Sequence, residues 1–152
     1  MKIREIRQTD ADSLSDLILA VYEESSFATT FDSKPGREEL GELVKKKVIG
    51  SCNGHVIDFV AIEKGAVVAD CELVSEGSGS GMIGILVSKQ HRRKGIGSEL
   101  VKKCCDEAKM HGLRVIRAEI KKQNGVAMVF FSKCGFTDYA DGEVRVMVKK
   151  LQ

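Results

Sequence analysis

The sequence has no tryptophan and a single proline, and aromatic residues make up only 5% of it. This shortage argues against a stacking platform for single-stranded nucleic acid. An excess of one charge is also missing, because 24 Lys and Arg residues stand against 22 Asp and Glu residues. A nucleic-acid-binding alternative rests only on the basic runs at residues 45–47 and 92–94, so no nucleic-acid partner is expected. We interpret Lys45, Lys46 and Lys47 as the solvated side of a helix.

Long apolar runs are absent as well. None approaches the roughly 20 residues that a membrane span needs, and the first residues show no apolar signal segment, so neither a membrane partner nor secretion is expected. The five cysteines are an odd set without C-x-x-C spacing. Such a set is typical of reduced thiols in a cytoplasm and predicts no metal site. A length of 152 residues predicts one domain over residues 1–152.

Hydrophobic periodicity alternates along the chain between the strand repeat and the helix repeat. It predicts the order β-α-α-β-β-β-α-β-α-β-β, an α/β (α+β) fold in which helices cover both faces of a mixed sheet. The expected elements are a strand at 2–7, a helix capped by Asp10, a helix at 37–49 ended by Gly50, strands around a turn at 64–65, a flexible connection at 76–81, a crossover to a parallel strand within 81–121, a short helix capped by Asn124, and a final hairpin. The strand at 144–148 is expected at the sheet edge, where it offers a homodimer contact.

The segment most informative about function is residues 90–98, Gln-His-Arg-Arg-Lys-Gly-Ile-Gly-Ser. It lies between a predicted strand and a predicted long helix. Gly95 and Gly97 lack Cβ atoms that would keep a ligand away from the backbone. Free N–H groups at the start of a helix form a nest for anions. The segment therefore predicts a diphosphate site, although a basic turn with glycines that ease a tight joint is the alternative.

Two blocks of residues resemble the GNAT acetyltransferase superfamily. Ile85-Leu86-Val87 followed by Arg92-x-x-Gly95-x-Gly97 is similar to the acetyl-CoA signature of that family. Asn124-x-x-Ala127, followed by Lys133-Cys134-Gly135-Phe136, is similar to its second conserved segment. The resemblance implies the GNAT fold, with a mostly antiparallel sheet, and an N-acetyltransferase that moves an acetyl group from acetyl-CoA to an amine and releases CoA. The acceptor would be a small molecule, a protein N-terminus or a lysine.

The resemblance also implies roles for individual residues. Main-chain groups near Ile85 and Val87 would hydrogen-bond pantetheine, and the N–H groups of residues 93–98 would hold the pyrophosphate. The residues expected to bind the cofactor are Ile85, Leu86, Val87, Arg92, Arg93, Lys94, Gly95, Ile96, Gly97, Ser98, Asn124, Ala127, Phe131 and Lys133.

Deprotonation of the acceptor amine calls for a carboxylate. Glu72, which shares a strand face with Asp70, and Glu119 are the candidate bases, with a solvated surface charge as the alternative for each. Glu24 and His91 are lesser candidates with the same alternative. Phe131 stands where the family usually has a tyrosine that protonates the leaving thiolate. Because phenylalanine cannot donate a proton, a non-catalytic module that binds acetyl-CoA remains the alternative function.

Overall fold

A seven-stranded sheet with the order β1-β2-β3-β4-β5-β7-β6 runs through the molecule. The structure is a computed structural model and describes residues 1–152. The strands are β1 (Lys2–Glu5), β2 (Val56–Glu63), β3 (Ala66–Gly77), β4 (Ser80–Val87), β5 (Val115–Lys121), β6 (Thr137–Asp141) and β7 (Val144–Lys150). All neighbouring strands are antiparallel except β4 and β5, which are parallel. The expected mixed and mostly antiparallel sheet is thereby confirmed.

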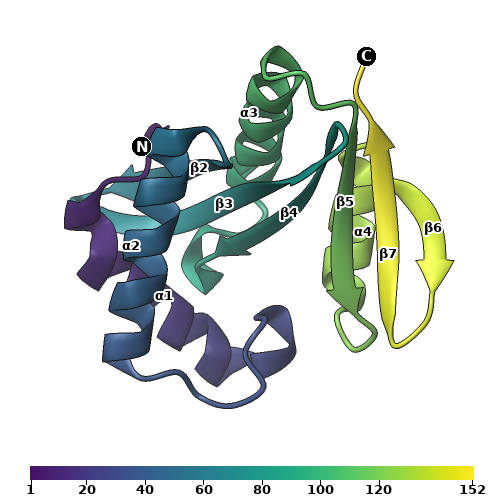
Figure 1. The fold of residues 1–152 in the computed structure, drawn as a ribbon. Helices are drawn as coiled ribbons and strands as arrows, with labels where there is room; N and C mark the ends of the chain where they lie inside the picture. The colour runs from purple at the N-terminus through teal and green to yellow at the C-terminus, as the bar shows by residue number, and fades with distance from the viewer.

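Helices cover the sheet on both sides (Figure 1). The four α-helices are α1 (Ala11–Glu24), α2 (Arg37–Asn53), α3 (Ile96–Met110) and α4 (Gly125–Lys133). A core of 9 buried residues joins α1 and α2 to β2 and β3. A larger core of 19 buried residues joins α3 and α4 to the opposite face. None of these helices combines the length and the apolar character that a membrane crossing requires.

Helix α3 shows how the sequence pattern becomes packing. Its apolar residues recur every three or four positions and therefore share one face of the helix. The structure buries six of them against the sheet, namely Ile96, Leu100, Val101, Cys104, Cys105 and Ala108, and leaves only Met110 at the end of the helix exposed. Cys104 and Cys105 are therefore core residues, and all five cysteines are free thiols.

Four expected boundaries or contacts were wrong. Helix α2 does not end at Gly50 but continues to Asn53, because Gly54 supplies the left-handed residue that ends it, with φ 77°. Residues 76–81 are not a flexible connection, since β3 and β4 pair almost to their ends around a turn with positive φ at Gly77, Ser78 and Gly79. Asp10 is the N-cap residue of α1 as expected, but its side chain does not bond to the helix N–H groups; its carboxylate instead accepts hydrogen bonds from Arg4 and from the backbone N–H of Arg7.

The fourth correction concerns the sheet edge. Residues 144–148 belong to β7, which pairs with β5 on one side and with β6 on the other. An interior strand has no free hydrogen-bonding edge, so β7 cannot offer a contact by strand pairing. The edge is β6, whose five residues are all exposed.

Substitution of Leu100 by alanine tests the core that α3 forms with the sheet. Leu100 is fully buried, at 0% exposure, and its truncation leaves a cavity. We expect Leu100→Ala to lower the free energy of unfolding in urea by roughly 2–5 kcal/mol. Met110→Ala is the control, because Met110 ends the same helix with 80% of its surface exposed, and it should change stability by less than about 0.5 kcal/mol. Equal effects of the two substitutions would contradict this description of the core.

Candidate active site

The central feature of the site is the parting of β4 from β5. These parallel strands pair only from Ser80 with Val115 to Met82 with Arg117, and beyond that point they diverge (Figure 1). On its other side β4 stays paired with β3, and the N–H of Ser88 donates to Val68. Because main-chain groups alternate in direction along an antiparallel strand, those of Ile85 and Val87 point toward the gap. These groups have no strand partner on the β5 side at the two residues that the resemblance implied, although the carbonyl of Val87 accepts a hydrogen bond from the Arg92 side chain.

The turn after β4 leads directly into a helix N-terminus. Gly95, with φ 82°, is the residue before α3, and the first intrahelical backbone bond runs from Glu99 to Gly95. The N–H groups of Ile96, Gly97 and Ser98 therefore have no partner inside the helix. Together with the helix dipole, they form a binding site for an anion.

Gly97 serves packing as well as access. A Cβ atom at this position would lie 3.0 Å from Cε1 of Phe130 and 3.4 Å from Cδ1 of Ile85. The missing side chain therefore lets the first turn of α3 pack against α4 and β4. The sequence predicted that Gly97 lacks a Cβ atom so that a ligand can approach the backbone. That prediction was wrong, because a Cβ atom at this position would point into the protein. Gly95 has no atom within 4 Å of that position and is required for its positive φ.

Arg92 is directed away from this nest of N–H groups. Its guanidinium makes two hydrogen bonds to Glu24 at the end of α1, of 2.6 and 2.7 Å, and its Nε donates to the carbonyl of Val87 at 3.0 Å. The hydrogen bond from Arg92 lowers the pKa of Glu24. Arg92 therefore ties α1 to the end of β4, while Arg93 and Lys94 are exposed beside the turn.

His91 and Glu24 thus have structural partners. The ring of His91 is hydrogen-bonded to Ser88 and to Glu63, which holds the turn against the β2–β3 hairpin. A hollow of about 190 Å³ lies between α1 and the turn. It is lined by Ala20, Val21, Glu24, Ser88, Lys89 and Gln90.

Helix α4 brings the second sequence block to the core. The side-chain oxygen of Asn124 accepts from the N–H of Ala127 at 3.1 Å and caps the helix, as expected, so its amide nitrogen is left to donate to a ligand. Phe131 is 4% exposed and packs edge to face between Phe130 and Phe136. Lys133 is exposed at the end of the helix. Phe131 is therefore a core residue without a proton to give.

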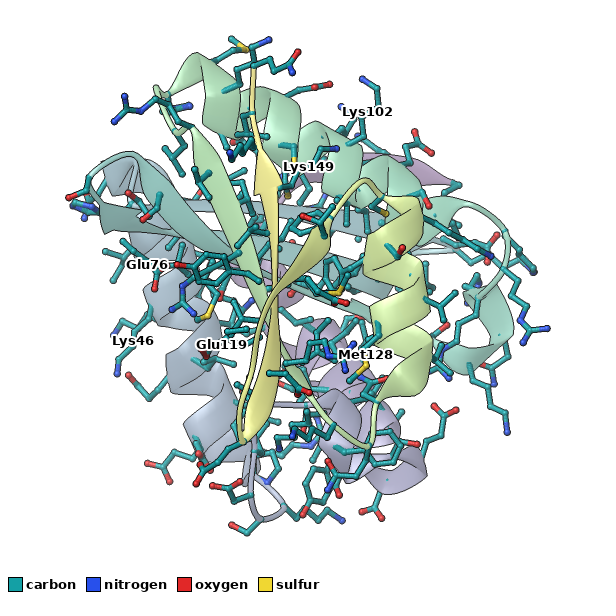
Figure 2. All side chains as sticks on the ribbon, turned by 90° about the vertical axis from the view of Figure 1, so that its right-hand side faces the viewer. Lys46, Glu76, Lys102, Glu119, Met128 and Lys149 are labelled. Atoms are coloured by element: carbon teal, nitrogen blue, oxygen red, sulfur yellow. The ribbon has the colours of Figure 1, made fainter.

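Glu119 belongs to an ion group on the exposed side of β5. Arg117 contacts Glu119 at 2.8 Å and makes two hydrogen bonds to Glu76 near the end of β3, of 2.7 and 2.6 Å. These carboxylates raise the pKa of Arg117. Figure 2 shows Glu76 and Glu119 on one side of the β5–β7 layer and Met128 of α4 on the other. Glu119 is thus already paired with a permanent cation.

The other candidate base, Glu72, belongs to a buried ion group. Lys47 of α2 places its Nζ 2.8 Å from Glu72 and 3.0 Å from both Asp58 and Asp70. Asp58 and Asp70 are buried, whereas the Glu72 side chain is 30% exposed. The expected pairing of Asp70 and Glu72 on one strand face is confirmed.

The expectation that Lys47 is solvated was wrong, because its residue exposure is 8%. Lys47 lies three and seven positions after the buried residues Val44 and Leu40, which places it on the same apolar stripe of α2. That spacing was the signal in the sequence. A run of three lysines concealed it.

Burial and neighbouring charges shift the pKa values in this group. Burial alone would lower the pKa of Lys47, but the three carboxylates raise it well above 10.5. Burial and the adjacent Asp70 raise the pKa of Asp58 well above 3.8. One oxygen of Asp58 and one of Asp70 have no other hydrogen-bond partner, and a proton held by Asp58 and donated to Asp70 satisfies both.

Comparison with known proteins agrees with the strand parting and the helix N-terminus. The model of the acetyltransferase (GNAT) family matches residues 3–136. The chain belongs to the GNAT family of acetyltransferases. The resemblance noted in the sequence is thereby confirmed.

Solved GNAT structures share the whole fold of this family member. A GNAT acetyltransferase from Streptococcus pneumoniae has 22% identity and a TM-score of 0.81, with 99% of each chain covered. YncA from Salmonella typhimurium, solved with acetyl-CoA, has 20% identity and a TM-score of 0.81, with 100% of this chain and 94% of that chain covered. The PaiA N-acetyltransferase from Thermoplasma acidophilum, solved with coenzyme A, has 19% identity, 98% coverage of each chain and a TM-score of 0.79.

The buried ion group of this GNAT protein makes stability depend on pH in a defined direction. The folded chain keeps the proton of Asp58 at pH values where the unfolded chain, with a pKa of about 3.9, has released it. The folded state then binds more protons, so its stability falls as pH rises above about 4. Asp58→Asn keeps the shape and removes the titration. We expect the free energy of unfolding, measured in urea from pH 5 to 8, to decline less in this variant.

The exposed Asp106, paired with Lys102 on α3, supplies the control for that experiment. Its pKa is lowered by the hydrogen bond from Lys102, so it is ionised throughout the tested range. Asp106→Asn should therefore keep the slope of the original protein. A slope in Asp58→Asn identical to that of the original protein would show that Asp58 is ionised in the folded state.

Proposed function

We propose that this GNAT protein is an N-acetyltransferase that transfers an acetyl group from acetyl-CoA to an amine held beside it in a ternary complex. The observation that carries the proposal is the parting of β4 and β5 directly before the free N–H groups of α3. An extended amide-containing arm fits backbone groups that lack a strand partner, and a diphosphate fits the helix N-terminus. One ligand joined in that way satisfies both sets of groups.

The residues present fit acetyl-CoA, which supplies the acetyl group as a thioester. Ile85 and Val87 would bind the pantetheine arm through their main chain. The N–H groups of residues 93–98 would bind the pyrophosphate, with Arg93 and Lys94 adding positive charge. YncA and PaiA, solved with acetyl-CoA and coenzyme A, share this fold and support the assignment.

The chemistry needs a neutral amine and a polarised carbonyl. The N–H of Val87 would donate to the thioester oxygen. Glu72 is the better base, since it is part-exposed and lies across from Gly84 in the β3–β4 register. Gly84 is itself exposed, and a Cβ atom there would meet nothing within 4 Å. That open space beside the strand gap is where an acceptor amine could reach both groups.

Phe131 gives specific support to a second function. Its buried ring lacks the hydroxyl that the family usually places there, so nothing on α4 at that position protonates the leaving group. General acid catalysis typically contributes about 10²–10⁴-fold. A thiol with an ordinary pKa of about 8.5 can nevertheless leave as thiolate. A module that binds acetyl-CoA without turnover is the second candidate, and CoA release with any amine would exclude it.

We further propose that residues 1–152 act as one catalytic domain and that any homodimer forms by pairing of β6. This strand is the exposed edge next to β7. Tyr139 on it is 75% exposed and offers an apolar ring to a second copy.

A pair of glycine substitutions at the two ends of α3 tests the cofactor site. Gly95 and Gly112 have nearly equal positive φ, 82° and 84°, and open space around them. Valine at either position carries the same backbone strain, of about 1–2 kcal/mol, but only Gly95 forms the anion site. With an amine panel and a thiol-release assay, we expect Gly95→Val to raise the KM for acetyl-CoA at least tenfold. Gly112→Val should change it less than twofold.

The same assay separates the two candidate functions. Release of CoA that depends on an added amine supports the transferase. Absence of release with any amine, from a folded protein that binds acetyl-CoA, would leave the non-catalytic module.

A further inference from the structure

We propose that Lys47, with Asp58 and Asp70 behind it, is a positioning device that holds Glu72 as an anion toward an acceptor that arrives as an alkylammonium ion. The inference rests on the proposed acetyl transfer and assigns to it both a further residue and a substrate class.

The contacts define a buried ion group in which only one member, Glu72, is accessible from solvent. Lys47 reaches from α2 through the layer between helix and sheet and touches one oxygen of each carboxylate, on β2 and on β3. The Lys47 and Asp70 side chains are 9% and 6% exposed and that of Asp58 is 0% exposed, against 30% for Glu72. Only Glu72 can therefore meet a ligand. Its Oε2 is held by Lys47, and its Oε1 is left for the acceptor.

The number of charged groups determines the net charge of this ion group and hence the charge at Glu72. Three carboxylates surround one ammonium, and Asp58 and Asp70 each keep one oxygen without a partner. One proton between these two buried oxygens satisfies both and leaves the group with a charge of minus one. That charge resides at Glu72, because it is the member in contact with water. A negative carboxylate beside the open space at Gly84 attracts a cation.

An alkylammonium ion, with a pKa of about 10.4 for a lysine side chain, is the acceptor that needs such a base. Its nitrogen would give one proton to Oε1 of Glu72, which passes it to solvent. The freed lone pair then forms the C–N bond while the C–S bond of the thioester breaks. The electron pair of that bond leaves with sulfur. After the C–N bond has formed, the nitrogen loses a second proton to give the amide. That loss balances the proton that the thiolate sulfur takes up to give the CoA thiol.

Several charged groups on the elements next to β3 and β4 are paired with one another. Helix α1 pairs Asp16 with Arg37 and Glu24 with Arg92, and β4 carries no charged side chain. On the far side of β4, Arg117 is held by Glu76 and Glu119. Lys47, with the two aspartates behind it, is therefore the cation in contact with Glu72.

Removal of the Lys47 charge tests the device. In Lys47→Met, Glu72 loses the ammonium that contacts its Oε2 and stays near Asp70, so the anion has no cation beside it. We expect kcat to fall at least tenfold, the KM for acetyl-CoA to change less than twofold, and the acidic limb of the pH profile for the alkylamine acceptor to move to higher pH. Lys47→Arg should restore most of kcat. Lys46→Met, at the exposed neighbouring position (Figure 2), should behave as the original protein.

A second readout does not depend on turnover. The carboxyl carbon of Glu72, followed by ¹³C NMR during a pH titration and assigned with Glu72→Gln, should titrate at higher pH in Lys47→Met than in the original protein. Should Lys47→Met fail to fold, the same comparison uses the double variant with Asp58→Asn, which removes one buried carboxyl together with the ammonium. Unchanged kcat, pH profile and Glu72 titration would overturn the proposal. A protein that releases no CoA but shows the shifted titration would refute the proposed acetyl transfer and leave the positioning role standing.

Discussion

The structure depends on the interior strand β4, which is paired with its neighbour β5 over only part of its length. Buried N–H and C=O groups are almost always paired, yet β4 loses β5 after Met82 while its other side stays bonded to β3. An interior gap of this kind is stable only when it can be filled or hydrated. The α3 helix follows β4 after the turn at residues 88–95, and its first turn packs against Ile85 of β4, so the unpaired backbone and the free helix N–H groups lie near each other. The proposed binding of acetyl-CoA and the proposed position of the acceptor both rest on that arrangement.

The two faces of the sheet are packed differently around this gap. On the α3 and α4 side, the packing is apolar, and Gly97, Phe130 and Ile85 fit together so closely that an added Cβ would displace a neighbour. On the α1 and α2 side, a buried lysine holds three carboxylates. Breaking a buried ion group usually costs more than its assembly contributes, so such a group is weak evidence for stability as such. Its solvent-accessible member, Glu72, gives it a use in the proposed chemistry.

Much of the fold was predictable from the sequence, because periodicity reports which residues face a core. The stripe of α3, the turn at residues 64–65 and the cap by Asn124 were all correctly predicted from local patterns. The order of strands was not, since the position of β7 between β5 and β6 depends on pairing between distant segments. The cradle at Gly95 was predictable because its residues are consecutive. The Lys47 group was not, because its members come from α2, β2 and β3, and a run of lysines resembles a solvated face.

The central claim is that the β4–β5 gap and the start of α3 bind acetyl-CoA. Calorimetric titration of the purified protein with acetyl-CoA tests it most directly. We predict one site per chain with a dissociation constant in the micromolar range. Added CoA should raise the apparent dissociation constant of acetyl-CoA, because CoA competes for the same groups. A folded protein that takes up no acetyl-CoA at millimolar concentration would contradict the claim and leave a GNAT fold with a different use.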